Sequence, residues 1–111
     1  MAKLVRGDVV VILFPFSDLS DIKKRPALVL KPLSGNDVIV CQITSQNNND
    51  MYSIPLDNTQ DMICGSLDKK SNIRPNKIFT ADREIIDRKV GSVKNYIIND
   101  VVKKITELIT T

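Results

Sequence analysis

The chain has 111 residues, of which 42% are apolar and 26% are charged, and its formal net charge is +3. This composition is typical of a globular protein, and the length predicts a single domain that spans residues 1–111. The longest apolar run, residues 9–14, is far shorter than the roughly 18 residues of a membrane-spanning helix. The first residues also lack the apolar stretch of a signal peptide. We therefore expect a cytoplasmic protein.

Histidine is absent from the sequence. Its absence excludes the commonest general base, the commonest metal ligand and the usual partner of a nucleophilic serine or cysteine. Cys41 and Cys64 have no ligand residues near them in the sequence, so neither a metal site nor a cofactor is predicted. Cys41 extends the apolar run 38–40 and is predicted to be a buried thiol.

The positive charge is concentrated in the second half of the chain. Residues 1–60 contain six basic and six acidic side chains, whereas residues 61–111 contain ten and seven. This mild excess is compatible with a polyanionic partner but does not require one.

The first half of the chain is predicted to form three strands. Residues 9–14 are β-branched and apolar on both faces, which indicates a buried strand that a proline terminates. After a polar connection, Arg25 and Pro26 precede a second strand at 27–30. A third strand is predicted at 37–45.

Shorter strands are predicted in the second half. Residues 51–56 include a proline and are predicted to form an edge strand. Residues 72–80 are predicted to hold two strands that Pro75 separates, and residues 89–93 a last short strand. Gly65 is predicted to lie in a tight turn.

The C-terminal segment changes to a helical period and predicts a helix at about 94–109, with Ser92 or Asn95 as its cap. Its apolar residues recur at three- and four-residue steps: Ile97, Ile98, Val101, Val102, Ile105, Leu108 and Ile109. This stripe either packs only against the sheet or also crosses the two-fold axis of a dimer. The predicted fold is mainly β: a small curled barrel of five to seven short strands with a C-terminal helix against it.

Five segments, in this order, resemble the PemK/MazF family of toxin endoribonucleases. They are GDVV at 7–10, FPFSDL at 14–19, KRPALVL at 24–30, ITS at 43–45 and IRPNKI at 73–78. The resemblance implies an SH3-like β-barrel, a homodimer and metal-independent cleavage of single-stranded RNA at short sequences. It also implies a cognate antitoxin that blocks the RNA groove.

Arg25 and Thr44 match the positions at which this family is assigned a catalytic Arg and Thr. Arginine can bind a phosphate through two parallel hydrogen bonds, and threonine offers a compact hydroxyl donor. Without the resemblance, the alternative for Arg25 is a solvated side chain after a lysine pair, and the alternative for Thr44, an ordinary strand residue, is the stronger of the two. Arginine remains protonated, so Arg25 is predicted to stabilise charge rather than to act as the base.

The resemblance also suggests a set of RNA-binding residues: Phe16, Asp18, Lys24, Ser45, Gln46, Arg74, Asn76 and Lys77. The general base stays open, with Asp18 and Asp21 of the first loop as candidates. Some members of the family carry an aspartate where this chain has Asn76, and an amide cannot titrate.

Two further sets of polar residues are candidates for contact with RNA. A basic cluster of Lys69, Lys70, Arg74 and Lys77 is either part of a phosphate-binding track or a solvated face. Base recognition is assigned to Gln46, Asn47 and Asn48, because few aromatic side chains are available for stacking.

Three functions follow from the sequence. The first is a toxin endoribonuclease that a cognate antitoxin neutralises. The second is a catalytically weak or inactive SH3-like barrel that binds RNA or protein, which Asn76 and the lack of histidine favour. The third, a single-strand-binding barrel of the OB type, is disfavoured by the low aromatic content.

Overall fold

The computed structural model describes residues 3–15, 22–46 and 51–111. The strands are β1 (Asp8–Pro15), β2 (Ile22–Pro32), β3 (Asp37–Thr44), β4 (Ile54–Leu56), β5 (Met62–Gly65), β6 (Ser71–Asp82) and β7 (Ile86–Val93). A 3₁₀ turn, η1 (Arg83–Ile85), connects β6 to β7, and the chain ends in α1 (Asn95–Thr110).

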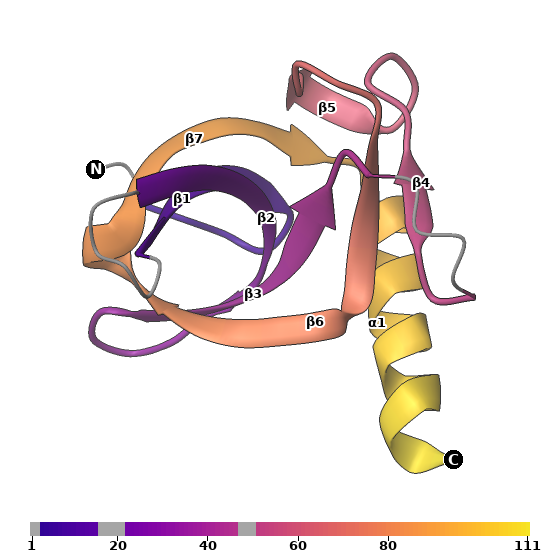
Figure 1. The fold of residues 1–111 in the computed structure, drawn as a ribbon. Helices are drawn as coiled ribbons and strands as arrows, with labels where there is room; N and C mark the ends of the chain where they lie inside the picture. The colour runs from indigo at the N-terminus through magenta and orange to yellow at the C-terminus, as the bar shows by residue number, and fades with distance from the viewer. Residues whose placement is uncertain (1–2, 16–21, 47–50) are drawn as a thin grey trace.

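The strands form one antiparallel sheet in the order β4-β6-β3-β2-β1-β7-β5. The sheet curls so that β1, β2, β3, β6 and β7 surround a common interior, and α1 lies beside the curl (Figure 1). The predicted mainly-β barrel with a C-terminal helix is thus confirmed. The edge position predicted for the proline-containing strand is also confirmed, although β4 is shorter than predicted.

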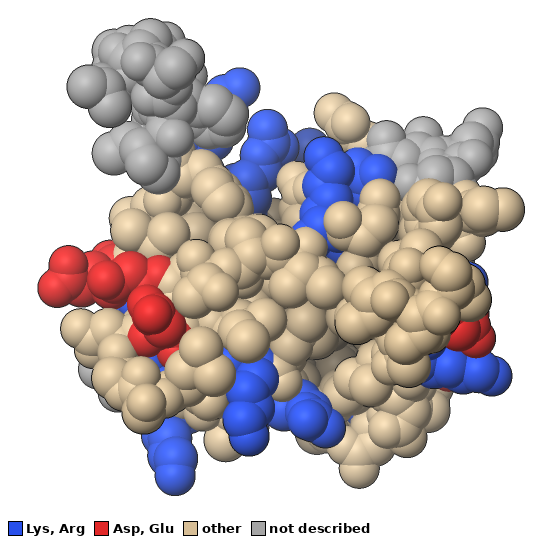
Figure 2. Space-filling model, turned by 90° about the horizontal axis from the view of Figure 1, so that it is seen from below, with Lys and Arg blue, Asp and Glu red and all other residues tan. Residues whose placement is uncertain are grey.

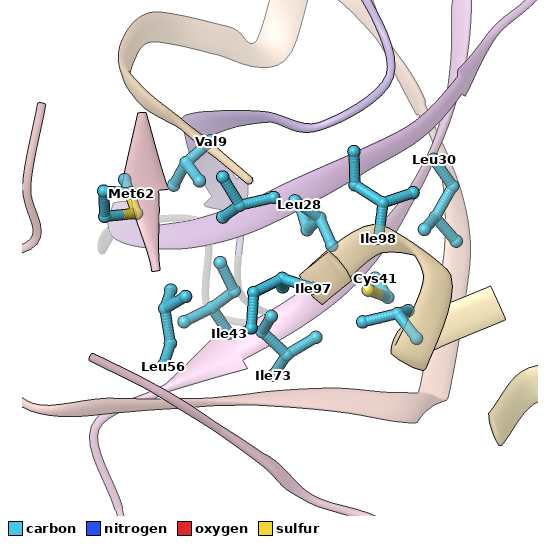
Figure 3. Packing of buried hydrophobic residues seen from close by; sticks show 12 residues of the cluster. Val9, Leu28, Leu30, Cys41, Ile43, Leu56, Met62, Ile73, Ile97 and Ile98 are labelled. Atoms are coloured by element: carbon cyan, nitrogen blue, oxygen red, sulfur yellow. The ribbon is translucent and has the colours of Figure 1, made fainter. Parts of the chain in front are cut away.

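The central strands are buried on both faces, which explains their continuous apolar runs. Successive side chains of a strand point to opposite faces. Val9 of β1 and Leu28 of β2 belong to a core cluster that includes residues of α1, whereas Val10 and Val29 belong to a second cluster without them. Figure 3 shows the first cluster between the sheet and the helix.

Helix α1 contributes Ile97, Ile98 and Val101 to the first cluster. The predicted caps are wrong, because Lys94 is the N-cap residue and makes no side-chain capping bond. Its backbone N–H donates to the Asp61 carbonyl at 2.8 Å, and its carbonyl accepts from Ile97 N–H at 3.0 Å. Backbone contacts with the loop before β5 therefore set the start of the helix.

Strand β6 is one long strand, not the predicted strand pair. Cys41 of β3 pairs with Ile78, but the next residue of β3, Gln42, pairs with Arg74. The residues between these two partners form a bulge around Pro75, which has no N–H for the ladder. The proline thus bends a continuous strand without ending it.

Strand β5 was not predicted. Strand β7 is longer than the last strand predicted at 89–93, and it lies inside the sheet between β1 and β5. Gly65 ends β5 with φ at +72°, where a Cβ would lie 2.0 Å from the Val90 carbonyl oxygen. Glycine is required here because β5 and β7 approach each other closely as the chain leaves the sheet. Within the described residues, no helix is long and apolar enough to span a membrane.

The two cysteines differ in accessibility, which gives a first testable prediction. Cys41 is buried as predicted, and burial raises the pKa of its thiol to about 12, whereas Cys64 is exposed. Because the thiolate is the reactive form, we expect a maleimide to label one thiol rapidly in native protein and two in denaturant. Cys64→Ser should remove the rapid phase. Rapid labelling of two thiols in native protein would contradict the structure.

Candidate functional site

A cavity of about 400 Å³ opens where β2 begins and β3 ends. One side is formed by residues 24–26 and 42–45 of these two strands and the bend after β3. The connection between β5 and β6, residues 66–69, and Arg88 and Val90 of β7 also line it. Val11 and Ser71 complete the lining. The cavity therefore collects side chains from segments that are far apart in the sequence.

Arg25 and Thr44 both line this cavity. The ladder between β2 and β3 ends at the pair Ala27 and Gln42, and Arg25 and Thr44 each lie two residues beyond that end. The proline that follows Arg25 restricts its backbone to extended conformations, and the Arg25 side chain is exposed. A guanidinium and a hydroxyl from neighbouring strands thus line one cavity.

The Thr44 side chain is oriented by the bend that follows β3. Its Oγ1 accepts a hydrogen bond from the Gln46 N–H at 3.1 Å. This turn between a hydroxyl and the backbone two residues later fixes the side-chain rotamer. The hydroxyl proton of the half-buried Thr44 is then available to a group in the cavity.

The wall at 66–69 is held by a side-chain clamp from a different loop. The Asn58 amide donates to the Leu67 carbonyl and accepts from the Leu67 N–H, both at 2.9 Å. The Ser71 hydroxyl donates to the Lys69 carbonyl at 2.8 Å. These three bonds stabilise a connection that contains no regular secondary structure of its own.

The cavity lining is cationic. It contains Lys24, Arg25, Lys69 and Arg88 against one carboxylate, Asp68. Asp87 lies between two of these cations: it pairs with its neighbour Arg88 and lies 3.5 Å from Lys24 Nζ. These pairs are exposed and therefore weak, so most of the positive potential remains available to an anion.

The surface charge is also unevenly distributed outside the cavity. On the face shown in Figure 2, basic side chains lie mainly toward the top and bottom of the view, around a middle without charged side chains, whereas acidic side chains lie at the left and right. Among the described residues, no three His, Cys, Asp or Glu side chains form a group that could hold a metal ion.

Several predicted site residues meet in the cavity, but others do not. Lys24 and Ser45 line it beside Arg25 and Thr44, and so does Lys69 of the basic cluster. Gln46 is exposed and is not among the lining residues, and it contacts Thr44 through its backbone. Lys70 lines a different cavity, next to residues 55–58.

The predicted residues of β6 lie outside this cavity. Arg74 is half-buried and pairs with Gln42, while Asn76 and Lys77 are exposed in the bulge. Phe16, Asp18, Asp21, Asn47 and Asn48 lie outside the described residues.

Sequence reasoning missed five polar lining residues: Gln42, Ser66, Asp68, Ser71 and Arg88. Arg88 of β7 pairs with Val11 of β1, which in turn pairs with Pro26 of β2, so pairing between strands distant in sequence places it at the cavity. Asp68 and Ser66 follow the unpredicted strand β5. Only Gln42 had a local signal, because it interrupts the apolar run of β3 two residues before Thr44.

Comparison with family models decides the affiliation of the chain. Residues 5–109 match the model of the PemK-like, MazF-like toxin of type II toxin-antitoxin systems. The chain belongs to this family. No match was found among curated proteins.

Solved structures share the MazF-like fold at low sequence identity. An endoribonuclease in complex with its cognate antitoxin, from a mycobacterial species, is 13% identical, has a TM-score of 0.75, and is matched over 96% of this chain and 95% of its own. MazF in a MazE–MazF crystal structure from Deinococcus radiodurans is 17% identical with a TM-score of 0.76, over 94% and 93% of the two chains. The toxin MazF-mt6 from Mycobacterium tuberculosis is 15% identical with a TM-score of 0.67, over 90% and 95%.

Proposed function

We propose that this MazF-like chain is an endoribonuclease toxin that cleaves single-stranded RNA at short sequences without a metal ion. The observation that carries the proposal is the meeting of Arg25 and Thr44 in a cavity with a cationic lining. A phosphate is the anion that an arginine fork and a hydroxyl donor bind well together.

The proposed reaction uses the RNA's own 2′-hydroxyl as nucleophile. Its oxygen forms a bond to the adjacent phosphorus while the bond from phosphorus to the 5′-oxygen breaks. One proton leaves the 2′-hydroxyl and one proton reaches the departing 5′-oxygen, so no water, metal or oxidant is consumed. The products are a 2′,3′-cyclic phosphate and a 5′-hydroxyl.

The reaction has three tasks: stabilising charge on the phosphate, accepting the 2′-hydroxyl proton and protonating the departing 5′-oxygen. In the proposal the cavity residues perform all three, and Arg25 is the donor to the 5′-oxygen. Arg25 stabilises the charge that develops on the phosphate oxygens, and the Thr44 hydroxyl donates to one of them. Asp68 is the carboxylate among the described lining residues and can accept the proton of the 2′-hydroxyl. Lys24, Lys69 and Arg88 bind neighbouring phosphates of the strand.

The family affiliation supports a protein partner as well. Structural neighbours include an endoribonuclease with its cognate antitoxin and a MazE–MazF complex. We infer that a cognate antitoxin neutralises this chain by covering the cavity, that the toxin acts in the cytoplasm on mRNA, and that it forms a homodimer.

The proposal is tested by incubating purified protein with a long unstructured RNA in excess EDTA and determining the chemistry of the fragment ends. We expect discrete cuts that carry a 2′,3′-cyclic phosphate on one fragment and a 5′-hydroxyl on the other. Intact RNA after incubation with folded, antitoxin-free protein would overturn the proposal and favour an RNA-binding barrel without catalysis.

A further inference from the structure

Gln42 presents a polar side chain inside the cavity to which neither the mechanism nor the sequence motifs assign a role. It is half-buried, lies on β3, and lines the cavity. No other described residue forms a hydrogen bond with its amide. An amide that is partly removed from water and not paired within the protein is free to bind a ligand.

Gln42 lies at a distance from Arg25 and Thr44, the residues proposed to bind the phosphate, that suits the span from a phosphate to its base. Gln42 and Thr44 are two residues apart on β3 and therefore lie on the same face, separated by about 7 Å along the strand. The residue opposite Gln42 is the buried Ala27, and Arg25 lies two residues before Ala27 on β2 and lines the same cavity as Gln42. A phosphate held by Arg25 and Thr44 thus has its neighbouring base within reach of the Gln42 amide.

The rest of the cavity suits the flat, mostly apolar faces of a base. Pro26 from β2, Leu67 from the clamped connection and Val90 from β7 provide apolar surface on different sides of the cavity. The volume of about 400 Å³ is within the range of sites that hold small organic groups. Single-stranded RNA is recognised mainly by unstacked bases that enter such sites and form hydrogen bonds along their edges.

We propose that Gln42 is a specificity-determining residue, whose amide forms hydrogen bonds with the edge of the base next to the phosphate bound by Arg25 and Thr44. This inference rests on the proposed function, because it takes the ligand to be single-stranded RNA. It differs from the assignment made from sequence, which gave base recognition to Gln46, Asn47 and Asn48. A glutamine amide donates and accepts at once, and this pattern discriminates among the bases by roughly tenfold or more.

The test measures binding separately from cleavage. Four 2′-fluoro pentanucleotides, each composed of one base, lack the 2′-hydroxyl nucleophile and stay intact on the protein. Fluorescence anisotropy at fixed salt should show that the wild-type chain prefers one base by about tenfold or more. In Gln42→Leu the four affinities should converge, because the phosphate contacts remain. Gln60→Leu, a matched change of an exposed glutamine outside the cavity, should retain the wild-type preference.

A second variant distinguishes a change in base preference from a loss of folded protein. Gln42→Glu keeps the size of the side chain but can only accept hydrogen bonds, so the preference should move away from uracil, the one base of the four without an amino donor. Equal affinity of the wild-type chain for all four bases, or an unchanged preference in both Gln42 variants, would overturn the inference. Cleavage of unmodified RNA is measured in parallel: a base preference that depends on Gln42 without cleavage would overturn the endoribonuclease and keep the base site.

Discussion

Replacing Arg25 by alanine is expected to lower the rate of RNA cleavage in EDTA by about 10²–10³-fold, the usual effect of removing a donor that stabilises transition-state charge. The Arg25 side chain lines the same cavity as Thr44, where the phosphate binds in the proposed reaction. Attack of the 2′-oxygen adds negative charge to the non-bridging phosphate oxygens in the transition state, and in the proposal Arg25 stabilises that charge. Single-turnover rates on one mapped RNA site provide the measurement.

Two further variants separate this effect from a general loss of charge. Lys31→Ala removes a positive charge from an exposed position of the same strand outside the cavity and should leave the rate within a factor of about two. Arg25→Lys keeps the charge but not the planar fork, so its rate should lie between those of the wild-type and alanine variants. Full cleavage by a folded Arg25→Ala protein would exclude the proposed mechanism.

Replacing Leu28 by alanine is expected to lower the free energy of unfolding by about 2–5 kcal/mol. Leu28 has no exposed side-chain surface and lies opposite Cys41 in the cluster that joins the sheet to α1 (Figure 3). Its truncation removes apolar contacts and leaves a cavity that the interlocked strands cannot close. Urea denaturation followed by circular dichroism measures the change.

Leu33 provides the matched control, because it is a leucine just after the same strand that is 38% exposed. Leu33→Ala should change the free energy of unfolding by no more than about 0.5 kcal/mol. Equal losses in the two variants would mean that the cluster beneath α1 is not the stabilising core that the structure shows.

Much of the fold was predictable because its signals are local. The doubly buried strands β1 and β3 have continuous β-branched runs, and α1 has a clear helical stripe. The predicted strand and helix boundaries were wrong where the local sequence is compatible with more than one structure. Pro75 is compatible with either a strand end or a bulge, and only its pairing with β3 distinguishes them. The start of α1 depends on a carbonyl of Asp61, which no capping pattern near Lys94 indicates.

The candidate site was predictable only through motifs. Composition and periodicity do not distinguish Arg25 from other exposed arginines or Thr44 from other strand threonines. The ordered segments of the family singled out both residues, and in the structure both line one cavity. Arg88 and Asp68 escaped detection because neither lies in one of those segments.

The sequence by itself determined the strand and helix periods, the absence of histidine chemistry, the buried Cys41 and the family affiliation, all of which depend on residue identity and short-range spacing. Only the tertiary structure decided which side chains share the cavity. The curl of the antiparallel sheet brings the start of β2, the end of β3 and the middle of β7 to one place. Pairing between distant strands sets that arrangement, because a shift of one residue in register moves every side chain to the other face.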